Sequence, residues 1–282
     1  MIKELVVEHK GKVVDKWDSY LSTYEHILAP YRDKPISLLE IGVANGGSLD
    51  IWAEYFPNAI NIVGCDITPE CGELIYDDPR VQVVVGDAND PDTKQKIAGI
   101  AERYDIIIDD GSHINADIIK AFSHYYPILS CGGIYFVEDL HTSYWEGWGG
   151  GLNLPLSAMA FFKRLADMPN FEHWRNGRTR KDYLRQFELV YEIAFDNYSL
   201  TTINSVMFMN SMVAIKSERS DLNKLGRRYV KGDDEHILPN MLHLDGMDIK
   251  ILVATATDDR KYDPFVLLQR INRLGEQHDN PV

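Results

Sequence analysis

Short apolar runs alternate with longer amphipathic segments along most of the chain. The runs lie at residues 36–42, 60–66, 81–85, 104–108 and 133–137, and the spacers between the later ones have helical length. Runs of this kind are typical of buried parallel strands, and their alternation with helical spacers predicts a doubly wound α/β sheet. Residues 48–56 carry a helical apolar stripe, which predicts a helix directly after the first strand.

The end of this pattern narrows the fold class. Residues 205–209 and 212–216 are apolar runs joined by Asn210-Ser211, which predicts a hairpin. Dinucleotide-binding sheets usually continue with parallel strands, whereas class I methyltransferases close with an antiparallel hairpin. We therefore expect an α/β fold with a Rossmann-like, class I methyltransferase sheet, mostly parallel, of seven strands ending in an antiparallel hairpin.

Three regions follow from this interpretation. Residues 1–35 form an N-terminal helical lead-in, and residues 36–216 form the methyltransferase core, with a lid insertion near 144–185. Residues 217–282 form a C-terminal extension of unknown role, in which 249–254 is strand-like and 264–274 is helix-like. Aromatic residues and glycines at 144–151 are typical of a mobile flap over a sugar, or of ordinary loop packing.

Charge and composition exclude some partners. The formal net charge is -14, and nucleic-acid binding normally requires clustered Lys and Arg, so a DNA or RNA partner is not expected. Three cysteines with no zinc-type spacing indicate a reducing, cytoplasmic setting. The N-terminus lacks a signal-type apolar core, and no run approaches the roughly 18 apolar residues of a membrane span.

The turn after the first predicted strand is rich in glycine. Gly42 and Gly46 are separated by three residues, which disfavours the G-x-G-x-x-G fingerprint of NAD and FAD sites. Glycines at such a turn let the backbone approach a ligand closely. We expect the turn to bind the amino-acid tail and ribose of S-adenosylmethionine, with Glu40 and Ser48 as further cofactor-binding residues.

Acidic residues end each of the next predicted strands. Asp66, followed by Ile67, could accept the ribose hydroxyls, and Asp87 could contact the adenine amino group. Asp109, at the end of the fourth strand, is assigned to the same cofactor site. Each acid alone could simply cap a turn, but acids at successive strand ends favour a shared cofactor site.

A second group of acids follows the fourth and fifth strands. Asp110, Glu138 and Asp139 are expected to converge as hard oxygen ligands for Mg²⁺ or Mn²⁺, because these strands are neighbours in such a sheet. His113 lies just beyond Asp110 and is predicted to be the general base on an acceptor hydroxyl, with Asp110 also in the catalytic group. Singly, these residues could be turn or surface positions.

Four blocks of the sequence resemble a known family. These are Leu39 to Val43 with Gly46 to Leu49, then Val63 to Ile67, Ile106 to His113, and Gly132 to Tyr135 leading to Glu138-Asp139-Leu140 and Thr142 to Trp145. They are similar to the metal-dependent O-methyltransferases that act on deoxysugars in macrolide antibiotic biosynthesis, and to cephalosporin hydroxylase-like relatives. The resemblance begins near Lys16-Trp17 and ends near Gly150.

The resemblance implies S-adenosylmethionine as cofactor, a metal at Asp110, Glu138 and Asp139, His113 as base, and a homo-oligomer. His141 stands where the family usually has Gln, so the acceptor does not carry over. The expected activity is methyl transfer to a hydroxyl of a sugar or glycosylated acceptor. Two alternatives stay open: an iron oxygenase using His113, His141 and Asp110, and a non-catalytic protein that binds S-adenosylmethionine.

Overall fold

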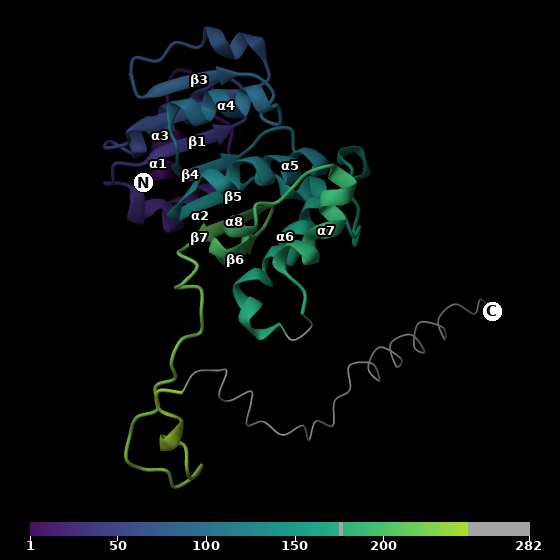
Figure 1. The fold of residues 1–282 in the computed structure, drawn as a ribbon. Coiled ribbons are helices and arrows are strands. Elements are labelled where there is room, and N and C mark those ends of the chain that lie inside the picture. Colours follow the sequence, from purple (N-terminus) through teal and green to yellow (C-terminus); the bar gives the residue numbers. More distant parts are fainter. Residues whose placement is uncertain (175–176, 248–282) are drawn as a thin grey trace, which may run out of the picture. The chain divides into compact units, whose positions relative to one another are not determined.

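A computed structural model of the chain describes residues 1–174 and 177–247. The chain divides into two compact units, Met1–Lys224 and Leu225–Val282. All seven strands of the predicted sheet fall in the first unit (Figure 1), and so do the predicted site residues. The strand-like run 249–254 and the helix-like run 264–274 lie outside the described residues.

The first unit is built on one seven-stranded sheet with the order β3-β2-β1-β4-β5-β7-β6. The first five strands pair in parallel, while β7 is antiparallel to both β5 and β6. This arrangement confirms the predicted mostly parallel sheet with a closing hairpin. The strands are β1 Ser37–Ile41, β2 Asn61–Asp66, β3 Val81–Val85, β4 Tyr104–Asp109, β5 Leu129–Val137, β6 Ile203–Met209 and β7 Met212–Ser217.

Two strands begin earlier than the sequence predicts: β6 starts at Ile203 rather than at residue 205, and β5 differs by more. β5 starts at Leu129 rather than at residue 133, because the strand continues through Gly132, whose φ of +81° interrupts the regular backbone. The pairing with β4 shifts register between Tyr104 and Ile106 at the same place. A glycine inside a strand often marks such a bulge. In the sequence alone, Gly132-Gly133 resembles a turn, so the strand was expected to start after it.

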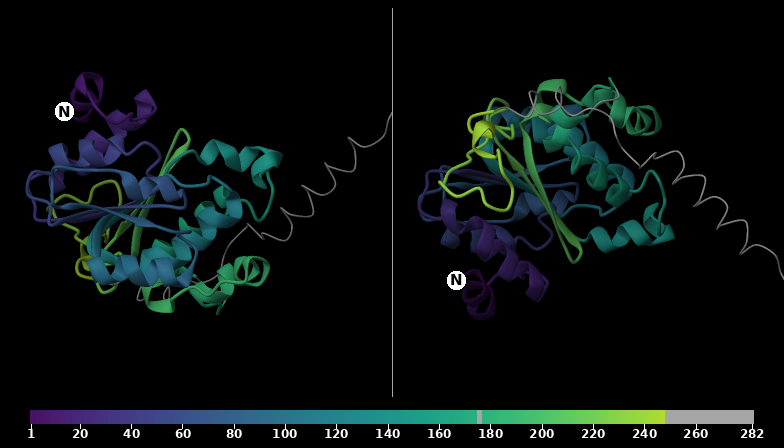
Figure 2. Two further views of the ribbon diagram at one scale, coloured as in Figure 1. Left: turned by 90° about the horizontal axis from the view of Figure 1, so that it is seen from above. Right: turned by 90° about the horizontal axis from the view of Figure 1, so that it is seen from below.

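Helices cover both faces of the sheet, because alternate residues of the central strands point to opposite sides. Leu38, Ile106 and Phe136 pack with the N-terminal helices and α3, whereas Leu39, Ile107 and Tyr135 pack with α5, α6 and α7. Figure 2 shows the N-terminal helices in purple on one side of the sheet. The helices are α1 Ile2–Glu8, α2 Asp18–Leu28, α3 Gly47–Tyr55, α4 Pro91–Ile100, α5 Asn115–Tyr125, α6 Ala158–Leu165, α7 Arg180–Tyr191 and α8 Asn197–Thr202.

Short 3-10 helices connect these elements. In the first unit they are η1 Ala29–Tyr31, η2 Pro69–Glu73, η3 Tyr126–Ile128, η4 Leu140–Tyr144, η5 Glu146–Trp148 and η6 Met168–His173, and the described part of the second unit contains η7 Leu242–Leu244. Within that second part, backbone hydrogen bonds join Arg228 to Met247 and Gly246 to Arg228. In the described part of the chain, no helix combines the length and apolar character needed to cross a bilayer.

Candidate active site at the carboxyl edge of the sheet

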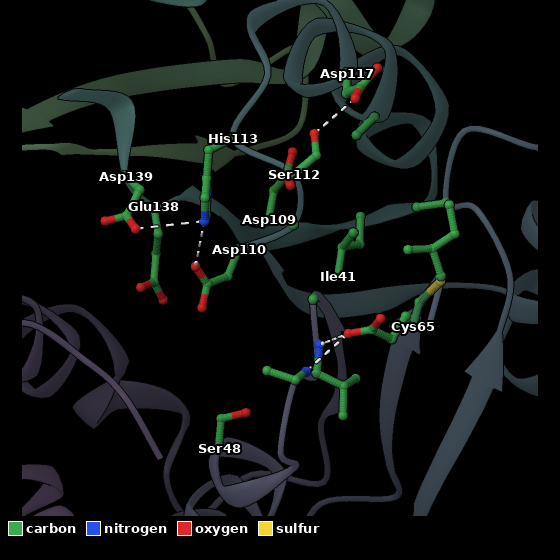
Figure 3. Close-up of a pocket in the computed structure, with 18 of the residues that line it drawn as sticks. Ile41, Ser48, Cys65, Asp109, Asp110, Ser112, His113, Asp117, Glu138 and Asp139 are labelled. Atoms are coloured by element: carbon green, nitrogen blue, oxygen red, sulfur yellow. Dashed lines mark hydrogen bonds and ion pairs between the residues drawn. The ribbon is translucent and has the colours of Figure 1, made fainter. Parts of the chain in front are cut away.

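A cavity of about 580 Å³ lies where the parallel strands end. It is lined by the turns after β1, β2, β3, β4 and β5 and by residues 13–17 of the N-terminal segment. Figure 3 shows lining side chains from the ends of β1, β2, β4 and β5. The fold brings almost all of the sequence-predicted site residues to this cavity, in agreement with the rule that open α/β sheets bind ligands at this edge. Those lining it are Gly42, Ser48, Asp66, Ile67, Asp87, Asp109, Asp110, His113, Glu138 and Asp139.

The remaining two predicted residues, Glu40 and Gly46, lie just behind the cavity wall. Glu40 is fully buried and accepts a hydrogen bond of 2.6 Å from the Ser48 hydroxyl. Burial raises the pKa of Glu40 above its usual value, although Lys16 and Ser48 oppose that effect. Gly46 caps α3 in a left-handed conformation. Neither residue lines the cavity, although Glu40 contacts the lining residue Ser48 and Gly46 directly precedes α3.

Gly42 has the tightest environment of the three glycines in the turn. Its φ is +93°, and a Cβ atom at this position would stand 2.0 Å from the backbone oxygen of Asp110. The β1 turn and the β4 turn can approach this closely only because residue 42 has no side chain. Gly42 thus sets the distance between the predicted cofactor turn and the loop that carries Asp110.

The replacement Gly42→Ala is expected to cost about 1–3 kcal/mol of folding free energy, because either turn must shift to relieve the overlap. Chemical denaturation checks this expectation. Gly99→Ala is the matched control, since a Cβ atom at Gly99 in α4 meets nothing within 4 Å and alanine favours a helix by up to about 1 kcal/mol. Equal stability of the two variants would show that the close approach at Gly42 is unimportant.

Asp66 is held by backbone N–H groups. One carboxylate oxygen accepts from Val43 and Ala44 at 2.8 and 2.9 Å, and the other accepts from Thr68 at 2.8 Å. Partial burial favours the neutral acid, but these N–H groups outweigh it and lower the pKa of Asp66 below its usual value. Asp66 is thus an ionised acceptor that also ties the end of β2 to the glycine-rich turn.

The other predicted cofactor residues surround Asp66 at different depths. Ile67 is exposed at the rim, and the exposed Asp87 accepts a hydrogen bond from the backbone of Asn89. Asp109 is buried, and burial raises its pKa to about 7. Its Oδ2 atom has no hydrogen-bond partner among the described residues. Asp109 is thus a buried acid of the cavity lining, whereas Ile67 and Asp87 are exposed.

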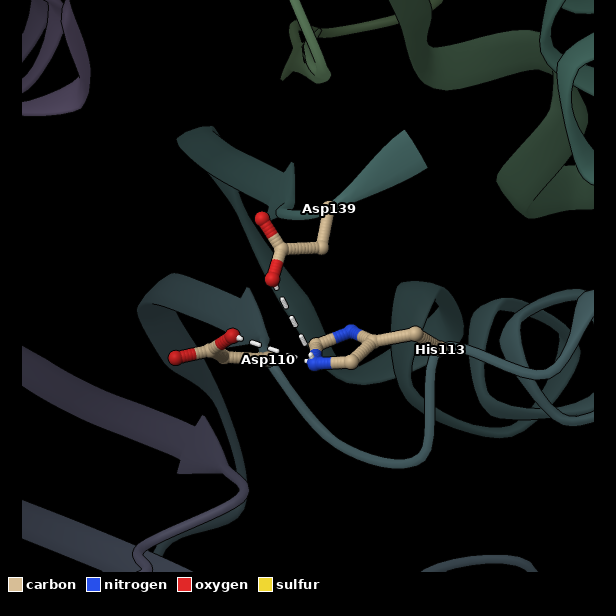
Figure 4. Close-up of side chains that lie close together, drawn as sticks. All are labelled: Asp110, His113 and Asp139. Carbon is tan, nitrogen blue, oxygen red and sulfur yellow. Dashed lines mark ion pairs between the residues drawn. The ribbon is translucent and has the colours of Figure 1, made fainter. Parts of the chain in front are cut away.

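Asp110, His113 and Asp139 come together at the opposite end of the cavity (Figure 4). His113 Nε2 lies 3.8 Å from Asp110 Oδ1 and 3.6 Å from Asp139 Oδ2. One ligand atom from each residue lies within 4.8 Å of the others. Two converging carboxylates fit a hard divalent cation, so this donor set is chemically suited to Mg²⁺ or Mn²⁺.

An unusual backbone conformation turns two of these side chains inward. His113 and Asp139 have φ values of +57° and +53°, in the left-handed region that non-glycine residues seldom adopt. The Thr142 hydroxyl donates to the His113 carbonyl at 2.8 Å and fixes the loop. Such strain, of order 1–3 kcal/mol per residue, persists where the surroundings enforce it and is concentrated at functional sites.

Glu138 lies beside this group but has other partners. Its carboxylate accepts from the Tyr24 hydroxyl at 2.5 Å and from Lys16 Nζ at 2.8 Å. Burial raises its pKa, while Lys16 opposes the shift. The third acid predicted for the metal therefore faces an ammonium group, and it does not belong to the cluster formed by Asp110, His113 and Asp139.

Lys16 is a residue of the cavity lining to which the sequence interpretation gave no role. Its side chain is 4% exposed, and its Nζ lies 2.5 Å from Asp110, 2.8 Å from Glu138 and 3.4 Å from Glu40. Burial disfavours its charge, but the three carboxylates outweigh burial and hold the pKa of Lys16 well above its usual value. The acids at the strand ends indicated that a cation lies among them. The sequence interpretation took that cation to be a metal ion alone, whereas in the structure the Lys16 ammonium is also there.

We call Asp110, His113 and Asp139 the metal-type cluster. His141 lies outside it. Its Nδ1 atom is 2.5 Å from the Ser211 hydroxyl and 3.8 Å from Asp139 Oδ1. Among the described residues, the groups able to share a metal comprise only the cluster of Asp110, His113 and Asp139. The arrangement of two histidines and one carboxylate considered for iron is thus not assembled from His113, His141 and Asp110.

Exposed aromatic rings extend from this end of the cavity. The His141 ring is edge-on to Trp17 at 6.4 Å between centroids and to Trp145 at 4.6 Å, and Trp145 contacts Trp148 at 5.5 Å. Trp17, Trp145 and Trp148 are 60%, 48% and 39% exposed. We call Trp17, His141, Trp145 and Trp148 the aromatic row.

The segment that carries the aromatic row is ordered by its own hydrogen bonds. Gly150 N donates to the Trp145 carbonyl at 3.0 Å, and Gly151 N donates to the Ser143 carbonyl at 2.9 Å. Asn115 Nδ2 donates to the Trp148 carbonyl at 2.9 Å. The glycine-rich run that resembles a flexible hinge in the sequence thus forms part of a defined turn.

Several curated proteins are similar to this chain, although no protein-family model matches it. The 8-demethyl-8-alpha-L-rhamnosyl tetracenomycin-C 2'-O-methyltransferase of Streptomyces olivaceus is 40% identical over 163 residues, covering 54% of this chain and 42% of the relative. The L-olivosyl-oleandolide 3-O-methyltransferase of Streptomyces antibioticus is 34% identical over 189 residues, covering 60% and 47%. The chain thus spans less than half the length of these relatives.

Solved structures show the same fold. MycE methyltransferase from the mycinamycin biosynthetic pathway, in complex with Mg, SAH and mycinamycin VI, superposes with a TM-score of 0.59 and 27% identity, covering 74% of this chain and 52% of MycE. A second crystal form, with Mg and SAH, gives a TM-score of 0.61 at 26% identity, covering 84% and 55%. The seven-stranded sheet of this chain is thus the sheet of a class I methyltransferase.

Proposed function

We propose, from the homology of this chain to sugar O-methyltransferases such as those of tetracenomycin and mycinamicin, that it transfers a methyl group from S-adenosylmethionine to a sugar hydroxyl. The observation that carries this proposal is the meeting of Asp110, His113 and Asp139 at one end of a cavity whose other end is the glycine-rich turn. A protein that only binds the cofactor would have no use for a base and two acids placed there.

The cofactor end of the cavity has the features that the donor requires. S-adenosylmethionine supplies an activated methyl group on a sulfonium. The turn at Gly42 leaves room for close approach of the ligand, and Ser48 lies at the start of α3. Asp66 is proposed to accept from the ribose hydroxyls through the lone pairs that its backbone partners leave open, and Asp87 from the adenine amino group. Ile67 and Asp109 complete this end.

His113 is proposed as the general base. Sugar hydroxyls are weak acids, so the acceptor must lose its proton as the new bond forms. The acceptor oxygen bonds to the methyl carbon while the carbon–sulfur bond breaks, the sulfur keeps the electron pair, and the proton passes to His113 Nε2. Asp110 and Asp139 would hold Mg²⁺ or Mn²⁺, which supplies stabilisation of the developing alkoxide charge.

Glu138 was expected to bind the metal as well. We propose that it acts through Lys16, because its carboxylate is already engaged by the ammonium at 2.8 Å and by Tyr24 at 2.5 Å. The four charged groups Lys16, Glu40, Glu138 and Asp110 then form one buried network beneath the metal site. Asp110 belongs both to this network and to the metal site.

The aromatic row is the proposed acceptor side. Aromatic faces pack well on sugar rings and on apolar aglycones, and the row begins beside Asp139. The relatives are named for rhamnosyl tetracenomycin-C, olivosyl-oleandolide and mycinamicin VI acceptors. We propose a glycosylated acceptor of this class. We expect no nucleic-acid partner and no membrane span.

We propose a cytoplasmic setting and a homo-oligomeric assembly for this chain. All three cysteines are free thiols, with Cys65 and Cys71 buried and Cys131 exposed, which favours a reducing, cytoplasmic compartment. A homo-oligomer is proposed from the family resemblance alone. Light scattering of the purified chain tests this assembly.

Replacing Trp145 or Trp148 by alanine is expected to raise KM for a glycosylated acceptor about 10-fold, because each ring contributes roughly 1 kcal/mol of packing beyond its buried area. The affinity for S-adenosylmethionine should not change, since neither ring lines the cofactor cavity. Tyr198→Ala removes an exposed ring that is also absent from this cavity and serves as the control. Unchanged KM in both tryptophan variants would remove the row from the acceptor site.

The proposed activity is tested by incubating the chain with methyl-labelled S-adenosylmethionine, Mg²⁺ and a panel of glycosides. The panel should contain rhamnosylated and olivosylated aglycones, the free sugars and the free aglycones. We expect label only in the glycosides, with none when a chelator replaces Mg²⁺. Label in a free aglycone, or labelling that is independent of divalent metal, would contradict the proposed acceptor class or the proposed metal role.

A further inference from the structure

The two carboxylates of the metal-type cluster are each held by a donor from the N-terminal segment. Trp17 Nε1 donates to Asp139 Oδ1 at 3.0 Å, and the Tyr20 hydroxyl lies 2.8 Å from the same oxygen. Lys16 Nζ donates to Asp110 Oδ2. Each acid therefore has one oxygen occupied by residues 16–20 and one oxygen left for the site.

The free oxygens are those that face His113. Asp139 Oδ2 lies 3.6 Å from His113 Nε2, and Asp110 Oδ1 lies 3.8 Å from it (Figure 4). A carboxylate at the end of a strand can rotate about its side-chain bonds, but a hydrogen bond to one oxygen fixes the direction of the other. Groups that orient metal ligands in this way typically change metal affinity by about 10–100-fold when they are removed.

The segment that carries these donors is anchored on both sides. Before it, Gly47 N donates to the Val13 carbonyl at 3.2 Å, and Lys12 Nζ lies 3.1 Å from Asp50. After it, α2 is buried through Tyr20 and Tyr24. The donors are thus fixed relative to the sheet, and the segment can set the orientation of Asp139.

The aromatic ring of Trp17 has a face that is not involved in the hydrogen bond to Asp139. Its ring is 60% exposed and stands edge-on to the His141 ring, at the start of the aromatic row. The N–H edge of Trp17 therefore faces the metal-type cluster while its ring faces the acceptor side. Tyr20, in contrast, is 1% exposed and can act only through its hydroxyl.

We propose that Trp17 and Tyr20 are positioning residues that orient Asp139 for metal binding, and that Trp17 also contacts the acceptor through its ring. This inference rests on the proposed metal site. Different parts of the Trp17 side chain have the two roles. The indole N–H orients the metal ligand Asp139, and the aromatic face contacts the glycosylated acceptor. Tyr20 has the first role alone.

The test measures Mn²⁺ affinity of the full chain by calorimetry and by the spin resonance of free Mn²⁺, without acceptor. Trp17→Phe removes the indole N–H, and Tyr20→Phe removes the hydroxyl, which also accepts from the Asp139 backbone N–H at 3.0 Å and lies 3.0 Å from the Ser211 carbonyl. Each is expected to weaken Mn²⁺ binding about 10-fold or more. Tyr31→Phe is the matched control, because the Tyr31 hydroxyl donates to the Gly132 carbonyl and does not contact the cluster. Thermal unfolding should be unchanged in Trp17→Phe, whose side chain is mostly exposed.

Acceptor kinetics at saturating metal separate the two roles of Trp17. KM for the glycoside should stay near the wild-type value in Trp17→Phe and Tyr20→Phe, and should rise about 10-fold in Trp17→Ala. If wild type binds no Mn²⁺, the metal site of the proposed function fails. If wild type binds Mn²⁺ and Trp17→Phe and Tyr20→Phe bind it equally well, the positioning role is overturned while the proposed function stands. Equal KM in Trp17→Phe and Trp17→Ala would overturn the acceptor role.

Discussion

His113→Asn is expected to lower kcat about 10²–10⁴-fold, because it removes the proposed general base. Asparagine is the suitable replacement, since His113 has a φ of +57° and asparagine tolerates the left-handed region better than most residues. The affinity for S-adenosylmethionine should not change. The measurement is single-turnover methyl transfer to a glycoside at saturating metal.

Mn²⁺ affinity of the same variant distinguishes two roles for His113. Its Nε2 atom lies among the atoms that could share a metal, so the side chain could serve either as base or as ligand. The proposal predicts nearly unchanged Mn²⁺ binding together with the loss of kcat. His236→Asn, an exposed histidine outside the cavity, is the control. Wild-type kcat in His113→Asn would rule out the base.

Lys16→Met is expected to lower the free energy of unfolding by about 3–5 kcal/mol, because it leaves buried carboxylates without their counter-ion. Glu40 and Glu138 are 0% and 2% exposed, so these carboxylates have little contact with solvent to offset the loss of the ammonium. Methionine keeps most of the side-chain volume, which limits any cavity effect. Urea unfolding with a chelator present measures the change without interference from bound metal.

Lys12→Met provides the matched comparison on the same segment. Lys12 pairs with Asp50 at 3.1 Å, but both side chains are partly exposed, and such pairs contribute only about 0–1 kcal/mol. A Lys16→Met protein as stable as Lys12→Met would show that the acids neutralise themselves by binding protons, and the buried network would lose its structural role.

The parts of the fold that follow from local pattern were predictable from the sequence. β3 was predicted at its observed bounds, and the hairpin of β6 and β7 was recognisable from two apolar runs around Asn210-Ser211. The start of β5 was not predictable in the same way, because Gly132 and Gly133 resemble a turn unless their pairing with β4 is known. Register with a neighbouring strand is a tertiary property that a glycine pair does not reveal.

The candidate site was predictable as far as strand order places acids at one edge. Asp110, His113 and Asp139 meet as the neighbouring strands required. The partner of Glu138 was not predictable from the sequence. Lys16 lies 122 residues before Glu138, and no sequence motif links the two. Long-range pairing of charges depends on how the N-terminal segment crosses the cavity, which the hydrophobic pattern does not specify.

The most direct test of the central claim is calorimetric titration of S-adenosylmethionine and S-adenosylhomocysteine into the full chain, with and without Mg²⁺. The same titration is made on Asp66→Asn and, as control, on Asp77→Asn, an exposed acid that does not line the cavity. The account predicts binding to wild type and to Asp77→Asn, and at least about 10-fold weaker binding to Asp66→Asn, through loss of a charge-assisted hydrogen bond. Absence of binding to wild type under every condition would contradict it.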